Sequence, residues 1–264
     1  MMGLICNEHV KIYRRARTWI FFAAIMAIAI LGAALKHHTA VQLHDKETAW
    51  MFMDSMGRAV YLVIVFASIV AGDIVGGEFA GGTVKLLLIR PHRRWKILLS
   101  KYLSVLSFSL TLLVFTVFIA WLVGGLVFGF SGAGEPYLLS HGGHVVSIPA
   151  SSESVRTYAY LAIPLLLTST LAFMISTLFR SSVVAIALSV FLVLFGPVIT
   201  EVLHSYAWDR FVLFANWNLA PYFENDISPL PNMTLSFSII VLIVYYVVFL
   251  AISWLSFTKR DVSA

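Results

Sequence analysis

Long apolar stretches alternate with short polar ones along the whole chain. A transmembrane helix needs about 20 mainly apolar residues, with a range of roughly 17 to 25. Six runs meet this requirement: residues 19–35, 59–75, 102–128, 158–178, 183–202 and 235–257. The third is longer than one crossing needs, so we expect it to tilt or to extend beyond the bilayer. Ten-residue segments of alternating polarity, which would indicate a membrane β-barrel, are absent. The pattern therefore predicts an all-α, polytopic membrane protein with six transmembrane helices.

The composition leads to the same fold class. Of the 264 residues 60% are hydrophobic and only 12% are charged, whereas a soluble domain is about half apolar and a quarter charged. A single globular core of this size could not bury so much apolar surface. We therefore treat residues 1–264 as one transmembrane domain. Nucleic-acid binding is excluded as a function class, because the chain has no soluble domain to carry a basic patch.

The positions of Lys and Arg predict the orientation in the membrane, because cytoplasmic connections carry an excess of both. With the N-terminus inside, thirteen of the 18 basic residues fall in cytoplasmic segments. They are Lys11, Arg14, Arg15, Arg17, Lys85, Arg90, Arg93, Arg94, Lys96, Lys101, Arg180, Lys259 and Arg260. Six spans return the C-terminus to the same side. We expect a multi-pass plasma-membrane protein with both termini in the cytoplasm and a cytoplasmic amphipathic lead-in at residues 1–17.

Sequence motifs for enzymatic chemistry are absent from the chain. It has no Gly-Lys pair and therefore no P-loop for ATP, no G-x-G-x-x-G and no H-E-x-x-H. The histidine pairs His37-His38 and His141/His144 are a weak metal signal, and we interpret them as solvated loop residues. The sequence thus predicts no catalytic residue, no metal site and no cofactor bound by this chain. It favours a protein that is not itself an enzyme.

Residues 78–101, between the second and third predicted spans, are unusually basic for a membrane connection. Val84, Leu87 and Leu88 share one helical face, and Thr83 is a suitable N-cap. The residue before a proline is biased out of the α region, so a first short helix should end near Arg90 and a second should begin around Pro91. A basic cluster that only contacts anionic lipid is one explanation. It does not account for Glu78 among so many cations.

The same segment resembles the signature of type-2 ABC transporter permeases, the membrane subunits of bacterial ATP-driven exporters. The match runs through Glu78-x-x-x-Gly82-Thr83-x-x-x-Leu87-Leu88-x-x-Pro91-x-x-Arg94 and continues to Lys101. Residues 7–19 are similar to the amphipathic lead-in helix of such subunits, and the six-span layout also fits. Elsewhere the resemblance concerns architecture alone, and nothing in the outer loops identifies a substrate.

The resemblance implies a function and a set of partners. Residues 78–101 would form a cytoplasmic coupling helix that docks on a separate P-loop ATPase, with Arg90 on the same surface. Two copies of the ATPase would bind ATP and Mg²⁺, and a second permease subunit, identical or paralogous, would complete the pathway. The complex would export an amphiphile such as a peptide antibiotic, a drug or a lipid. A secondary transporter or channel that does not use ATP is the alternative.

Polar residues inside the spans offer two further hypotheses. Ser68 and Ser189 either line a substrate pathway or bond to neighbouring helices, which is the more frequent role of such residues. Asp73 is the only carboxylate in the second apolar run. It either reaches interfacial water or pairs with Arg14, Arg15 or Arg17 of the lead-in, with Arg180 as a second choice. In the paired case it would attach the lead-in helix to the second span.

Overall fold

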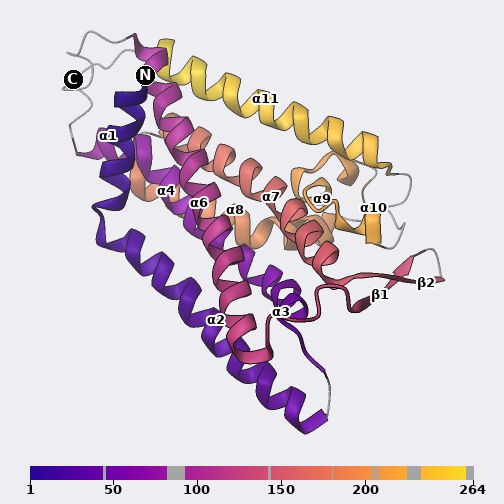
Figure 1. Cartoon of the computed structure of the whole chain (residues 1–264). Helices are drawn as coiled ribbons and strands as arrows, with labels where there is room; N and C mark the ends of the chain where they lie inside the picture. Colours follow the sequence, from indigo (N-terminus) through magenta and orange to yellow (C-terminus); the bar gives the residue numbers. More distant parts are fainter. Residues whose placement is uncertain are drawn as a thin grey trace.

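The computed structural model describes residues 1–43, 46–81, 93–141, 144–179, 181–203, 206, 208–224 and 233–259. Figure 1 shows a bundle of long helices. The helices are α1 (Met2–Tyr13), α2 (Ala16–Leu43), α3 (Ala49–Met56), α4 (Val60–Ala80), α6 (Arg94–Phe128), α7 (Ala150–Phe179), α8 (Ser182–Leu203), α9 (Leu213–Asn216), α10 (Ala220–Glu224) and α11 (Leu235–Lys259). Two 3-10 turns, Gly57–Ala59 and Asp209–Phe211, precede α4 and α9 respectively.

The structure confirms the predicted fold class. Six helical segments are long and apolar enough to cross a membrane: α2, α3 together with α4, α6, α7, α8 and α11. The protein is therefore an all-α, multi-pass membrane protein. In Figure 1, α1 and the last turns of α11 lie at the same end of the bundle.

Several helices extend beyond the apolar runs. α2 continues to Leu43, and the second span begins at Ala49, because α3 and the Gly57–Ala59 turn prolong α4. α6 is a single helix from Arg94, so the last part of the segment 78–101 belongs to the third span and not to a separate surface helix. Polar first turns such as Arg94–Lys101 are tolerated because helical hydrogen bonding continues wherever no proline or glycine interrupts it.

A two-stranded antiparallel sheet stands at the end of the bundle away from α1. β1 (Pro136–His141) pairs with β2 (His144–Pro149), with Tyr137 opposite Ile148. It lies within the Gly/Ser-rich connection between the third and fourth spans. Figure 1 shows this hairpin projecting beside α3 and α10.

Helix α4 is at the centre of the packing. It contacts α6, α7 and α8, and its small residues permit close approach. A Cβ added at Gly76 would lie 2.9 Å from the backbone carbonyl carbon of Ser181, just before α8. Ser176 of α7 donates from Oγ to the Gly72 carbonyl (2.6 Å) and accepts from the Gly76 amide (2.9 Å). Such contacts replace the hydrophobic driving force that helices lack inside lipid.

The outer helices keep their apolar faces exposed. In the most apolar window, 67% of the α3–α4 span and 72% of α7 are buried, against 28% of α2, 22% of α8 and 17% of α11. Exposed apolar side chains such as Leu31, Leu194 and Ile243 would be unfavourable in water. They are suitable in contact with lipid tails, which are as apolar as Leu.

Cys6 provides a test of the predicted orientation. It is the only cysteine in the sequence and its side chain on α1 is exposed. We expect a membrane-impermeant maleimide to label it only after the membrane has been opened. Because the Cys6 side chain is exposed, an absence of labelling in intact cells would not result from its burial within the chain. Labelling of intact cells would place the N-terminus outside and contradict the orientation.

Candidate functional site

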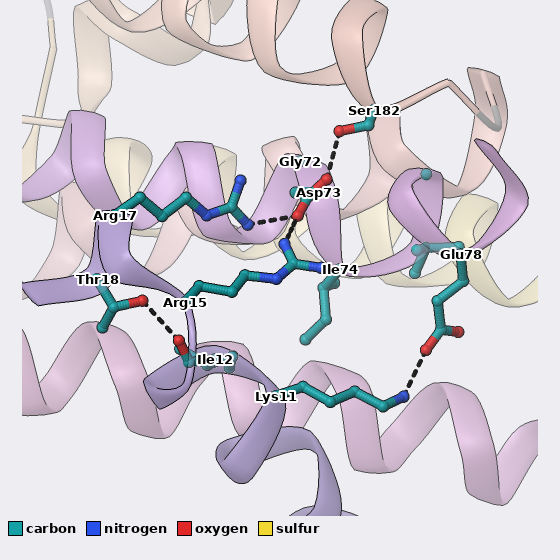
Figure 2. A network of polar contacts seen from close by, with 12 residues as sticks. Lys11, Ile12, Arg15, Arg17, Thr18, Gly72, Asp73, Ile74, Glu78 and Ser182 are labelled. Atoms are coloured by element: carbon teal, nitrogen blue, oxygen red, sulfur yellow. Dashed lines mark hydrogen bonds and ion pairs between the residues drawn. The ribbon is translucent and has the colours of Figure 1, made fainter. Parts of the chain in front are cut away.

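Seven charged side chains form two neighbouring ion clusters, together called the ion network, at the end of the bundle that carries α1. Its members are Glu8, Lys11, Arg15, Arg17, Asp73, Glu78 and Lys101. They come from α1, the short link to α2, α2 itself, α4 and α6. Figure 2 shows the part of this network that joins the lead-in to α4.

The break between α1 and α2 is stabilised by side chains of α2. The last carbonyls of a helix have no partner within the helix. Thr18, which is fully buried, donates from Oγ1 to the Ile12 carbonyl at 2.6 Å, and Trp19 donates from Nε1 to the Tyr13 carbonyl at 3.0 Å. Figure 2 shows the Thr18 contact. The connection is therefore a defined turn, and it places Arg15 and Arg17 beside α4.

Lys101 is the most deeply buried charge of the network. It lies on α6, is fully buried, and its ammonium contacts Glu8 Oε2 at 2.9 Å and Glu78 Oε1 at 2.7 Å. It also donates to the Ile74 carbonyl at 3.2 Å. An ion kept away from water is stable only when opposite charges and hydrogen bonds replace its hydration. Lys101 has three such partners, from α1 and α4.

Glu78 is shared by two lysines. Lys11 and Lys101 each place the ammonium nitrogen 2.7 Å from Glu78 Oε1, and Lys11 also contacts Glu8 Oε1 at 2.9 Å. Glu78 lies near the end of α4 and Lys101 lies in the second turn of α6. The pair thus joins the two helices that flank residues 82–92, and Lys11 adds α1 to the same cluster.

The electrostatics of α1 are consistent with this pairing. Burial raises the pKa of the Glu8 carboxyl, but the ammonium groups of Lys101 and Lys11 outweigh burial, and the pKa lies below its usual value. Burial lowers the pKa of Lys11, but hydrogen bonds and attraction to Glu78 and Glu8 outweigh that effect and the pKa is raised. Both groups therefore carry their charges at neutral pH.

Asp73 forms the second centre of the network. Its carboxylate is buried and pairs with Arg15 and Arg17, and Ser182 at the start of α8 donates its hydroxyl to it. Figure 2 shows all three donors around Asp73. Gly77, one turn further along α4, leaves room for the carboxylate: a Cβ there would lie 2.7 Å from Asp73 Oδ1. Asp73 thus connects the lead-in, α4 and α8.

Among the basic residues proposed as partners of Asp73, the structure brings Arg15 and Arg17 to it. Arg14, the C-cap of α1, is exposed and forms no ion pair within the described residues. Arg180 lies outside the described residues. The structure therefore shows that Asp73 contacts the lead-in. That this contact transmits motion between the lead-in and α4 remains a hypothesis.

Only part of the predicted coupling segment is described. Glu78 and Lys101 belong to the network, and Arg94 is half-buried and donates from Nη1 to the Thr258 carbonyl of α11 at 3.4 Å. The other predicted positions, Gly82, Thr83, Leu87, Leu88, Arg90 and Pro91, lie outside the described residues. The network contacts both flanks of this interval.

Ser68 and Ser189, predicted as possible pathway residues, are buried in helix contacts. Ser189 donates from Oγ to the Ile186 carbonyl at 3.1 Å, the backbone bonding that is frequent for serine in membrane helices. The Ser68 hydroxyl is fully buried on α4, and no described residue bonds to it. The pathway hypothesis remains a prediction for both positions.

The sequence reasoning did not select Glu8 and Lys11. A usable signal was present, since Glu8 is the only acidic residue in a strongly basic lead-in and Lys11 follows it at the helical spacing i, i+3. His37 and His38 lie in α2, and the side chains of His141 and His144 lie outside the described part of the chain. Within the described ranges, no three His, Cys, Asp or Glu side chains gather as a metal centre requires.

The fold and the network define a polytopic α-helical membrane protein with a charged helix junction at one end. The chain belongs to the family described as "Protein of unknown function (DUF2705)", whose profile matches residues 20–263. It is similar to the uncharacterized protein YhcI of Bacillus subtilis, with 30% identity over the full length of both chains. It is also similar to the uncharacterized membrane protein YdbK of the same organism, with 33% identity over 68% of this chain and 70% of that one.

Proposed function

We propose that this protein is the membrane permease subunit of an ABC exporter, driven by a separate cytoplasmic P-loop ATPase. The observation that carries the proposal is the pairing of Lys101 with Glu78 and Glu8. Through it, the two flanks of residues 82–92 and the lead-in helix α1 are held in one cluster. The type-2 permease signature falls on the same positions, so a force applied to this interval would act on α1, α4 and α6 together.

In this proposal the chain carries out no bond chemistry. ATP and Mg²⁺ would bind to two copies of the ATPase, whose closure would press on residues 82–92. The buried ion pairs at Lys101 and Asp73 would transmit that displacement to the spans, because Lys101 joins α1, α4 and α6, and Asp73 joins the lead-in, α4 and α8. A second permease subunit and the plasma-membrane lipid would complete the pathway. The cargo would be an amphiphile, such as a peptide antibiotic, a drug or a lipid.

A secondary transporter or channel is the alternative. Such proteins place ionisable residues near the middle of the membrane, where a charge is costly and usually functional. Among the described residues, the buried charged side chains are Glu8, Asp73, Lys101, Glu153 and Asp209. Glu8 and Asp209 lie outside the spans, Glu153 lies in the first turn of α7, and Lys101 and Asp73 each lie about two turns from the nearer end of α6 and α4. This distribution favours a junction at the membrane surface over an ion path through the bilayer.

Co-purification tests the proposed function. We expect a P-loop ATPase encoded by an adjacent reading frame to co-purify with the tagged chain, with ATP hydrolysis stimulated in the complex. Arg90→Glu with Arg94→Glu should reduce the bound ATPase by roughly tenfold or more, because reversing interface charges costs more than 1.4 kcal/mol. Arg210→Glu, a charge reversal near α9, is the matched control and should leave binding unchanged.

Both variants must insert with the wild-type topology, since the double reversal also weakens the excess of cytoplasmic cations. The proposal is contradicted if the wild-type chain binds no ATPase. If the ATPase binds equally well to the double variant, residues 90–94 contact lipid and the coupling surface lies elsewhere.

A further inference from the structure

A pocket of about 180 Å³ opens at the end of the bundle opposite the ion network. It is lined by Asp54, Gly57, Arg58, Tyr61, Thr157, Tyr160, Leu161, Asn218 and Ala220. Asp54 precedes Asp73 by nineteen residues of the same span, which corresponds to about 28 Å along a helix. Since the hydrocarbon layer is about 30 Å thick, the pocket and the network lie near opposite faces of the membrane. Figure 1 shows α3 and α10 at this end.

The pocket contains two opposite charges that are not paired with each other. Asp54 and Arg58 are four residues apart, a spacing at which a continuous α-helix would bring them together. The 3-10 turn Gly57–Ala59 lies between α3 and α4, so the α-helix is not continuous between the two residues. Gly57 permits this turn to pack on α7, because a Cβ there would lie 2.7 Å from Thr157 Cγ2.

Each charge has only neutral contacts among the described residues. The Asp54 carboxylate accepts from Thr157 Oγ1 at 2.8 Å and from Tyr137 Oη at 3.0 Å. Both donors orient the carboxylate and leave its charge uncompensated. Arg58 is exposed, and within the described part of the chain no carboxylate lies within ion-pair distance of its guanidinium.

The remaining walls supply aromatic faces and a donor. Tyr61 lies 6.1 Å from the Trp217 ring, and Tyr160 is stacked on Phe223 at 5.0 Å, so neighbouring rings hold both tyrosines in place. The Arg156 guanidinium already lies over the Tyr160 ring, 6.0 Å from its centroid, so the exposed ring of Tyr61 is the face available to a ligand. Aromatic faces attract ammonium groups. Asn218 uses its Oδ1 to accept from the Ala220 amide at 3.2 Å, which leaves its amide group as the donor for an anion.

We propose that this pocket binds a zwitterion of the phosphoethanolamine type, such as the headgroup of an ethanolamine phospholipid. Its ammonium group meets Asp54 beside Tyr61, and its phosphate meets Arg58 and Asn218. Pockets for drug-sized ligands measure about 300 to 1,000 Å³, so the smaller volume here suits a headgroup whose acyl chains remain outside. The proposal does not depend on ATP or on a partner subunit.

Native mass spectrometry of the purified chain, delipidated and then given equal phosphatidylethanolamine and phosphatidylglycerol, tests this site. We expect the wild type to retain phosphatidylethanolamine preferentially. Arg58→Gln should reduce that retention at least about threefold, and Asp54→Asn should abolish the preference over phosphatidylglycerol, which lacks the ammonium group. Arg58 is exposed, so its substitution does not threaten folding. Arg210→Gln and Glu201→Gln remove charges outside the pocket and should change nothing.

Equal retention by wild type, Arg58→Gln and Asp54→Asn would overturn the proposal, because the lipid would then be bound only non-specifically around the bundle. Competition with soluble glycerophosphoethanolamine distinguishes the two sources of the zwitterion. If it displaces the lipid at equal concentration, the site supports binding of a soluble zwitterion. If it does not, the site supports a membrane-lipid headgroup.

Discussion

Replacing Lys101 by Met should lower the melting temperature of the protein by roughly 6 to 20 °C. Removing one partner of a buried ion pair costs about 3 to 5 kcal/mol, because the other charge stays buried without compensation, and each kcal/mol shifts a chain of this size by about 2 to 4 °C. Here Glu8 and Glu78 would face each other with only Lys11 between them. Thermal unfolding in detergent, followed by circular dichroism, measures the shift.

Two further variants make this result specific. Lys96→Met removes an exposed lysine five residues earlier on α6 and should change stability by no more than about 0.5 kcal/mol. Adding Glu8→Gln to Lys101→Met removes one of the stranded carboxylates and leaves Lys11 paired with Glu78. The double variant should therefore regain much of the loss. If Lys101→Met and Lys96→Met melt at the same temperature, the network does not stabilise the junction.

Asp73→Asn should release the lead-in helix without preventing membrane insertion. A hydrogen bond to a charged group contributes about 1.5 to 3 kcal/mol, and solvent screening at the partly exposed arginines reduces this to roughly 1 to 2 kcal/mol. Arg15 and Arg17 would then repel each other beside a neutral amide. A spin label on Cys6 should gain mobility, and ATPase-coupled export, if the proposed function is correct, should fall several-fold.

Charge exchange identifies the interaction responsible. Asp73→Arg alone should leave the spin label on Cys6 most mobile. The double variant Asp73→Arg with Arg15→Asp should restore part of the wild-type spectrum. Arg14→Asp is the matched control, because Arg14 is exposed and forms no ion pair within the described residues. It should restore nothing. Equal label mobility in the wild type and Asp73→Asn would show that Asp73 does not hold α1 in place.

The six spans could be predicted because membrane helices depend on one quantity, the length of an apolar run. Their ends could not, since helical hydrogen bonding continues past the apolar residues wherever no proline or glycine stops it. α6 therefore begins at Arg94, within a basic segment. The β1–β2 hairpin was also missed, because its pairing depends on register between Tyr137 and Ile148 and the alternation in each short strand is weak.

The part of the candidate site around Asp73 could be predicted from the sequence. A carboxylate within an apolar run requires a partner, so the position of Asp73 in the sequence predicts its pairing with arginines of the lead-in. The same reasoning could not have reached the pairing of Lys101, because Glu8 lies 93 positions away and only packing of α1 on α6 brings them together. The pocket at Asp54 likewise depends on the single 3-10 turn Gly57–Ala59 between α3 and α4. No periodicity in the sequence reveals such a turn.

The uninterrupted helix α6 has a mechanical consequence. Lys101 fixes it about 10 Å from its first residue and leaves about 40 Å on the other side, at 1.5 Å per residue. α6 does not move alone, because it packs on α1, α2, α3, α4 and α7. A tilt of α6 about Lys101 would therefore also displace these helices, as far as the end of α6 at Phe128. At that far end, Phe52 of α3 packs so closely that a Cβ on Gly124 would lie 2.9 Å from its ring. A displacement of α6 at one membrane face would thus reach α3, which lines the pocket at the other.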